Sequence, residues 1–133
     1  MTTHLIDKIA WIHLADGRVL STRSHGRERY YLPGGKREAG ESDLDTLVRE
    51  AKEELTVDLD PFTATFLGEF RAQADAHPDG IEVRMRCYES AYQGRIQASA
   101  EIAEVVWLTY ADRHLTSPVD QIIFDHLHDQ GRL

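Results

Sequence analysis

Residues 34 to 57 read GGKREAGESDLDTLVREAKEELTV, and this stretch decides the fold. Its first third is a loop punctuated by glycines, and the remainder has the pattern of an amphipathic helix. The apolar stripe of that helix consists of Leu44, Leu47, Val48, Ala51 and Leu55. Ser42, with Asp45 three residues later, indicates a capping pair where the helix begins.

The other side of this helix is acidic. Glu50, Glu53 and Glu54 fall at i, i+3 and i+4, so their carboxylates crowd one patch of the helix. Like charges at this spacing cost roughly a few tenths of a kcal/mol per pair, and a bound divalent cation would reverse the sign of that cost. Three converging oxygen ligands suit Mg²⁺, which completes its octahedron with water and substrate phosphate. Taken alone, however, such a cluster is more often a solvated helix face.

The loop in front of the helix favours the metal site over the solvated face. Gly34, Gly35 and Gly40 allow the backbone to approach the carboxylates closely, which has no obvious role on an ordinary solvated helix. Lys36 lies beside these glycines. It either supplies a positive charge to a phosphate oxygen or is simply solvated.

The spacing of these residues resembles the Nudix box, which here spans residues 35–57. The matching positions are Gly35, Glu41, Arg49, Glu50, Ala51, Glu53, Glu54 and Val57. One position departs from the family pattern, because Thr56 stands where the family usually has glycine.

Thr56 lies where the helix should end. A glycine there typically supplies a left-handed C-cap. A β-branched residue in that conformation costs roughly 1–2 kcal/mol, so we expect the helix to end differently or to run on slightly. The change removes no metal ligand.

The resemblance implies a three-layer α/β/α sandwich with a mixed β-sheet, and we expect residues 1–133 to form a single Nudix hydrolase domain. The order of predicted elements agrees, with strands before and after a central helix and a second helix at the end. The resemblance also implies Mg²⁺-dependent cleavage of a pyrophosphate bond in a nucleoside diphosphate derivative, with Mn²⁺ as an alternative ion.

Most of the site residues lie in the box. Mg²⁺ held by Glu50, Glu53 and Glu54 would bridge phosphate oxygens, neutralise charge and activate a water, and the resemblance adds the Gly34 carbonyl as a ligand. The general base stays open between Glu53, Glu50 and Glu101.

Two further pairs of residues follow from the resemblance. Nudix enzymes can carry a loop glutamate that joins the metal shell or takes the proton from water, and here Glu101 competes with Glu104 for that role. Glu41 and Arg49 match family residues that pair to hold the loop against the helix. Their expected role is therefore orientation rather than bond-making.

Substrate-binding candidates lie before the box. Arg23 closes a predicted strand, and in the Nudix resemblance an arginine at this strand end commonly faces the substrate phosphates. Arg27 and Arg29 are weaker candidates, since loop arginines are usually solvated. Tyr31 could stack on a base, although packing is the commoner role for an aromatic residue. Lys36 completes the set of predicted substrate contacts.

The rest of the chain predicts strands at residues 6–14, 18–22, 30–32, 62–74, 81–87 and 101–108. Asp16-Gly17 predicts a hairpin turn between the first two strands. A last helix should begin at Ser117-Pro118, bury a stripe of Val119, Ile122, Ile123 and Leu127, and end at Gly131.

Composition limits the partners and the compartment. The formal net charge of −8 argues against binding a nucleic-acid backbone, but a single nucleotide stays compatible because cations can neutralise its phosphates. No run is long enough to span a membrane and the N-terminus lacks a signal-peptide pattern, so we expect no membrane partner. Cys87, the one cysteine, should lie in the core, and a reducing cytoplasm fits best. A monomer and a homodimer both remain open.

Substrate identity follows only by elimination. Nudix members acting on ADP-ribose often carry a proline where this chain has Ala72, and dinucleoside polyphosphate hydrolases an aromatic near Gln73 to Asp75. Residues 20–24 match the upstream motif of the coenzyme A subgroup only faintly. We therefore favour a MutT-type nucleoside triphosphate pyrophosphohydrolase over a nucleotide-sugar (ADP-ribose-like) pyrophosphatase. A non-catalytic nucleotide-binding Nudix domain is a third alternative, disfavoured because all the box glutamates are present.

Overall fold

The computed structural model describes residues 4–133. Its strands are β1 (His4–Trp11), β2 (Leu14–Ala15), β3 (Arg18–Ser24), β4 (Gly34–Lys36), β5 (Asp58–Leu59), β6 (Thr65–Gln73), β7 (Ile81–Glu89), β8 (Tyr92–Gln93) and β9 (Ile102–Leu108). The helices are α1 (Asp43–Leu55) and α2 (Pro118–Asp129), with short 3₁₀ turns at Pro61–Thr63 and Tyr110–Leu115. Within this described range, no helix is both long and apolar enough to cross a membrane.

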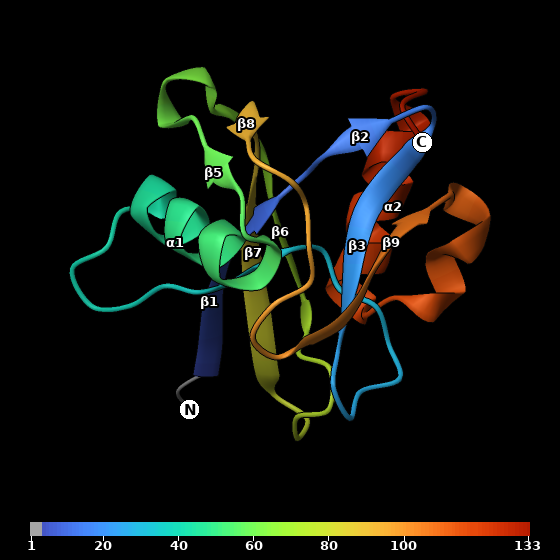
Figure 1. The fold of residues 1–133 in the computed structure, drawn as a ribbon. Helices are drawn as coiled ribbons and strands as arrows, with labels where there is room; N and C mark the ends of the chain where they lie inside the picture. Colours follow the sequence, from blue (N-terminus) through green and yellow to red (C-terminus); the bar gives the residue numbers. More distant parts are fainter. Residues whose placement is uncertain (1–3) are drawn as a thin grey trace.

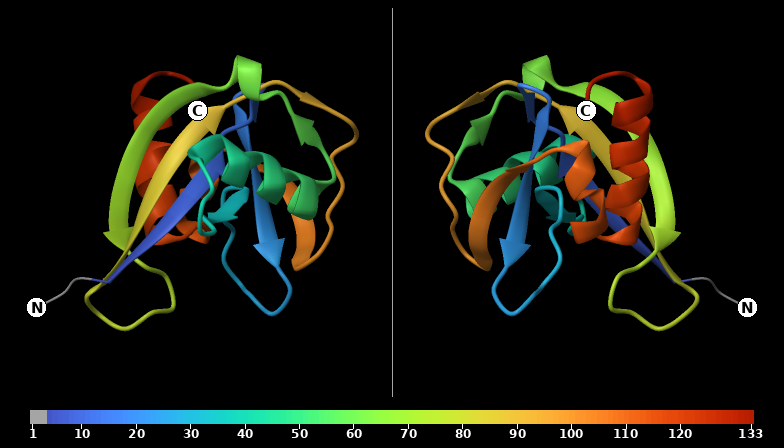
Figure 2. Two further views of the ribbon diagram at one scale, coloured as in Figure 1. Left: turned by 90° about the vertical axis from the view of Figure 1, so that its left-hand side faces the viewer. Right: turned by 90° about the vertical axis from the view of Figure 1, so that its right-hand side faces the viewer.

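Two sheets lie between the two helices (Figures 1 and 2). The larger sheet has the strand order β4-β1-β7-β6, with β1 and β7 parallel and the other neighbours antiparallel. The smaller sheet has the order β2-β3-β9, and β5 pairs with β8. A mixed sheet covered by a helix on each side confirms the predicted three-layer α/β/α architecture.

Each side of the sheets has its own apolar core. Alternate residues of β1 point to opposite faces, so Ile9 and Trp11 pack with α1 whereas Ala10 packs with α2. From α1 the buried apolar side chains are Leu47, Ala51 and Leu55, and from α2 they are Val119, Ile123, Phe124 and Leu127. Cys87 is fully buried in the core beside α2, as predicted.

The predicted stripe of α2 was wrong at one position. Ile122 is 40% exposed, and Phe124 is buried instead. Successive helix residues are about 100° apart, and the buried face is centred near Ile123 and Leu127 and extends toward Phe124. Ile122 therefore lies on the outer edge of the helix.

The strand expected at residues 30–32 is also wrong. Tyr30 and Tyr31 make only isolated bridges, and the regular strand is β4, which begins at Gly34, directly before the box. β4 pairs antiparallel with β1, with Gly34 opposite Ala10. Gly34 has φ 145°, and a Cβ there would lie 2.0 Å from the Ile9 carbonyl oxygen, so no other residue fits. Gly34 and Gly35 thus belong to the sheet.

Helix α1 begins as predicted and ends differently from prediction. Ser42 and Asp45 form a reciprocal capping box at its start. At its end Thr56 adopts the left-handed conformation (φ 60°) that we expected it to avoid. Its backbone N–H donates to the Lys52 carbonyl and its hydroxyl to the Arg95 carbonyl, both at 3.1 Å. These hydrogen bonds offset the strain, so threonine replaces the usual glycine without changing the cap.

Candidate active site

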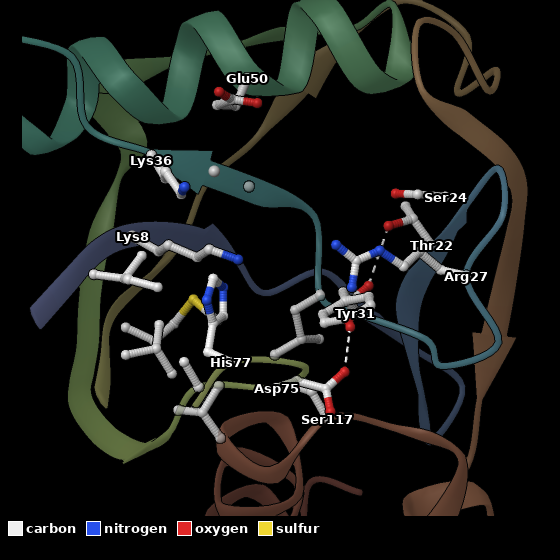
Figure 3. A pocket seen from close by; sticks show the side chains of 18 of the residues that line it. Lys8, Thr22, Ser24, Arg27, Tyr31, Lys36, Glu50, Asp75, His77 and Ser117 are labelled. Carbon is white, nitrogen blue, oxygen red and sulfur yellow. Dashed lines mark hydrogen bonds between the residues drawn. The ribbon is translucent and has the colours of Figure 1, made fainter. Parts of the chain in front are cut away.

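A cavity of about 350 Å³ opens between α1, the sheet and the start of α2 (Figure 3). Its apolar floor is formed by Ile6, Leu32, Val83, Met85 and Val119. Its polar lining includes both acids and bases: Lys8, Arg27, Lys36, Glu50, Glu54, Asp75 and Glu101. Such a cavity suits a small molecule with an apolar part and a strongly charged part.

Three glutamates converge at one end of this cavity. Single carboxylate oxygens of Glu50, Glu54 and Glu101 lie within 4.8 Å of one another. The first two come from adjacent turns of α1. The segment carrying Glu101 is tied to the end of α1 by backbone hydrogen bonds, including one of 2.9 Å from the Ser99 N–H to the Glu54 carbonyl.

Burial makes this acid group unusual. It raises the pKa of Glu54 to about 9, and the nearby Glu50 and Glu101 carboxylates act in the same direction. The Gly34 N–H donates to Glu54 at 3.0 Å and opposes the rise only in part. Burial also raises the pKa of Glu50. Crowded oxygen ligands that repel each other in this way fit a hard dication such as Mg²⁺.

Glu53 lies outside this group. Its side chain is 51% exposed, and its carboxylate is 3.6 Å from Arg49. Residues 50 and 54 differ by about 40° around the helix axis, whereas residue 53 projects further from the cavity side. The structure therefore brings together two of the three box glutamates and adds Glu101.

Arg49 links the box loop to the helix. It donates to Glu41 and to Glu50, each at 2.7 Å, and to the Lys36 carbonyl at 3.0 Å. The hydrogen bonds from Arg49, with one from the Glu38 backbone, lower the pKa of Glu41 to about 2. A Cβ on Gly35 would lie 2.4 Å from the Glu50 carboxyl carbon. Glycine at this position therefore lets Glu50 lie directly against the loop.

Arg23 is turned away from the cavity. Its guanidinium donates to Glu104 at 3.2 Å and to the Arg27 carbonyl at 3.0 Å, and Tyr30 donates to the same Glu104 carboxylate. Glu104, the rival of Glu101 at the sequence level, is thus occupied by other partners. Arg27 lines the cavity instead, and Figure 3 shows its guanidinium directed inward beside Tyr31.

Tyr31 and Lys36 both line the cavity. The Tyr31 hydroxyl donates to Asp75, and burial together with that carboxylate raises the pKa of Tyr31 to about 12. Arg29 lies 3.5 Å from Asp75 and not among the lining residues.

Sequence reasoning missed Lys8 and Asp75, which also line the cavity. The available signal for Lys8 was a lysine that alternates with the apolar Ile6 and Ala10 on one face of β1. Asp75 follows the end of β6 and had no such signal, since its neighbours are ordinary loop residues.

The sequence of the chain matches a known domain family. Residues 6–127 match the family model of the NUDIX domain. No curated protein sequence matches the chain.

Solved structures share the fold over nearly the whole chain. The E. coli ORF135 protein is 25% identical, with a TM-score of 0.69 over 96% of this chain and 91% of its own. The MutT protein from Methanosarcina mazei Go1 is 16% identical, with a TM-score of 0.77 over 100% and 99%. The E. coli dihydroneopterin triphosphate pyrophosphohydrolase is 21% identical, with a TM-score of 0.71 over 90% and 92%. With its family match over residues 6–127, the chain belongs to the NUDIX domain family and is a hydrolase acting on pyrophosphate bonds.

Proposed function

We propose that this protein is a Mg²⁺-dependent pyrophosphohydrolase of nucleoside triphosphates. The observation that carries the proposal is the convergence of Glu50, Glu54 and Glu101 at one end of a cavity that also holds basic side chains. In one cavity, the clustered carboxylates would bind a metal ion, and the basic side chains would bind the phosphate chain beside it.

The three clustered glutamates would hold the ion, with the Gly34 carbonyl as a further ligand. When bound, Mg²⁺ (or Mn²⁺) supplies charge neutralisation and lowers the pKa of a coordinated water. Glu101 is the exposed member of the cluster and the one carried on a loop, which suits a general base that exchanges protons with solvent. Glu53, exposed beside Arg49, is the alternative base.

The chain's own residues would bind and orient the rest of the substrate. Lys36 and Arg27 reach the cavity from two sides and can donate to phosphate oxygens. Tyr31 borders the apolar floor, where a base would lie. Arg49 and Glu41 would act through Glu50 by fixing its position.

A triphosphate is favoured over a nucleotide sugar by the charge of the cavity. Lys8, Arg27 and Lys36 line it together, so basic side chains are available to more than one phosphate of a triphosphate beside a bound dication. Among the structural neighbours, the names MutT and dihydroneopterin triphosphate pyrophosphohydrolase point in the same direction.

The test is turnover on a panel of substrates. Ribo- and deoxyribonucleoside triphosphates, dinucleoside polyphosphates, ADP-ribose and nucleotide sugars are incubated with the protein and Mg²⁺, and the products are resolved by chromatography. We expect a nucleoside monophosphate and pyrophosphate from at least one triphosphate, and no products when EDTA is present. Faster cleavage of ADP-ribose or a nucleotide sugar would replace the proposed substrate class. Binding without any cleavage would indicate a non-catalytic nucleotide-binding domain.

A further inference from the structure

Lys8 occupies a central position in the cavity. It lies on β1 directly opposite Lys36 of β4 in an antiparallel pair. Residues paired in this way project from the same face of a sheet. Figure 3 shows both side chains entering the cavity, one above the other.

The ammonium group of Lys8 has no acid partner. Within residues 4–133, no carboxylate oxygen lies within 4.0 Å of it, and the centroid of the Tyr31 ring is 5.9 Å away. Lys36 likewise has no ion pair in this range, whereas Lys52, on the outside of α1, pairs with Asp58 at 3.3 Å. The two unpaired ammonium groups therefore face the same cavity.

This arrangement is costly in the absence of a ligand. Burial lowers the pKa of Lys8, and the Lys36 ammonium acts in the same direction, while Asp120 and Glu54 act against it. Like charges directly opposite each other across a strand pair are destabilising, and a charge removed from water without a partner adds to the cost. An anion between the two lysines would offset both costs.

A structural role for Lys8 is the rival explanation. Asp120 is buried, and its Oδ1 atom has no hydrogen-bond partner. However, Asp120 accepts a hydrogen bond from the Leu32 N–H at 3.2 Å and none from Lys8. Asp120 is the carboxylate that raises the pKa of Lys8 most, yet its hydrogen bond comes from the backbone and not from the lysine.

We propose that Lys8 and Lys36 form a two-lysine clamp on the phosphate chain of the substrate, with the acid cluster holding the metal ion at the neighbouring end of the cavity. This inference rests on the proposed function and identifies Lys8 and Lys36 as the residues that select a polyphosphate. Each ammonium is a compact point charge that donates to phosphate oxygens from any direction. Two such donors favour the ligand with the largest number of adjacent negative charges, which is a triphosphate.

The experiment replaces Lys8 by methionine, which keeps the length and apolar stem of the side chain. Lys52→Met is the matched control, since Lys52 lies outside the cavity. Isothermal titration measures the binding of inorganic tripolyphosphate, a nucleoside monophosphate and the bare nucleoside in the presence of Mg²⁺. Tripolyphosphate is the main probe because it needs neither a known base nor turnover.

For Lys8→Met we expect tripolyphosphate to bind about 10- to 100-fold more weakly, which corresponds to losing one hydrogen bond to a charged group. The monophosphate should lose less, and the nucleoside should bind unchanged. In turnover, KM for the preferred triphosphate should rise more than kcat falls. Lys52→Met should match the wild type in every measurement.

Thermal unfolding separates this role from a structural one. Without ligand, Lys8→Met should unfold at the same temperature as the wild type or higher, because the change removes an unpaired and partly buried charge. A lower unfolding temperature would show that Lys8 stabilises the fold and would overturn the clamp.

The remaining outcomes are equally decisive. Unchanged tripolyphosphate binding by Lys8→Met, or no binding by the wild type, would overturn the clamp. Equal weakening for the nucleoside and for tripolyphosphate would place Lys8 at the base and would also overturn it. Wild-type protein that binds tripolyphosphate through Lys8 but cleaves no nucleotide would overturn the proposed function alone.

Discussion

Two charged clusters lie against α1, one near its first residues and one toward its end, and their charges are arranged in opposite ways. In the first, the outer cluster, acids and bases alternate on the α1 side of the sheet: Arg86 donates to Asp43 at 2.7 Å and Arg37 to Asp7 at 2.9 Å. In the cavity, acids gather with acids in the Glu50, Glu54 and Glu101 cluster, and lysine faces lysine.

The acidity of the two clusters shows the difference most clearly. Burial raises the pKa of Asp43, but hydrogen bonds from Tyr88, Arg86 and Arg37 outweigh it and bring the value to about 2. Burial and neighbouring carboxylates bring the pKa of Glu54 to about 9. In the outer cluster, Asp7 and Asp43 each have arginine partners, so the cluster stabilises the fold without a ligand. The cavity cluster is incomplete, and perturbed groups of this kind are typical of sites that await a ligand.

The largest expected effect comes from breaking the cavity cluster. Glu54→Gln should lower Mg²⁺-dependent turnover by about 10²–10³-fold or more, because it removes a metal-binding carboxylate while leaving the acceptor for the Gly34 N–H. Glu53→Gln should cost less than Glu54→Gln, since Glu53 lies outside the cluster. The measurement is kcat/KM for each variant, with circular dichroism to check the fold.

Glu82→Gln is the control for both variants, because Glu82 projects from the side of β7 away from the cavity-lining Val83. Full turnover by Glu54→Gln would remove the acid cluster from the mechanism. A larger loss for Glu53→Gln than for Glu54→Gln would mean that the side chains rearrange around the ion.

A smaller effect should follow when the orientation of the cluster is changed. Arg49→Lys keeps the charge but cannot contact Glu41, Glu50 and the Lys36 carbonyl together. We expect metal affinity and kcat/KM to fall by about 10- to 100-fold. Titration with Mn²⁺ measures the affinity directly, and an unchanged value would show that Glu50 is positioned without Arg49.

Breaking the outer cluster should affect stability and not activity. Asp43→Asn removes a charge that receives three side-chain hydrogen bonds, so the free energy of unfolding at pH 7 should fall by about 2 kcal/mol. Because the folded-state pKa of Asp43 is below its ordinary value of 3.8, this stabilisation is present above that pH and is lost as the pH falls toward 2.

Urea unfolding of Asp43→Asn and wild type at pH 7 and at low pH measures this dependence. Their stabilities should converge as the pH falls, and kcat/KM at pH 7 should stay within about twofold. A constant stability difference at all pH values, or a large loss of turnover, would contradict the division between the two clusters.

The smallest effect is expected at Thr56, where the chain departs from the box pattern. Thr56→Val keeps the left-handed strain but loses the hydroxyl that donates to the Arg95 carbonyl, so it should destabilise the protein by about 1 kcal/mol. Thr56→Gly loses the same hydrogen bond but relieves the strain, so its change should be smaller. Urea unfolding compares the two, and turnover should be unchanged in both. Equal losses would mean that the cap carries no strain.

Local signals in the sequence were sufficient for much of the fold. The capping box at Ser42, the Asp16-Gly17 hairpin and the end of α2 at Gly131 depend on neighbours within a few residues, and the structure has all three. The two helices and the alternating strand β7 follow from periodicity alone. Thr56 shows the limit of such reasoning, because its hydroxyl is satisfied by Arg95, a partner distant in sequence.

The site was predictable only where the helix itself determines it. Glu50 and Glu54 share one face of α1 by spacing, whereas the choice between Glu53 and Glu101 depends on where the loop before β9 is tied to the helix. Lys8 enters the cavity because of the pairing of β1 with β4 and β7. Sheet register is a long-range property that spacing within one strand does not reveal.

The central claim is that the clustered glutamates hold a hard dication completed by a phosphate chain. Crystals grown with Mn²⁺ and a non-hydrolysable nucleoside triphosphate analogue, measured at the manganese absorption edge, test it most directly. The account predicts an anomalous peak about 2.0–2.3 Å from carboxylate oxygens of Glu50 and Glu54, with phosphate oxygens in the same coordination shell. Bound analogue with Glu50, Glu54 and Glu101 pointing apart and no peak among them would contradict it.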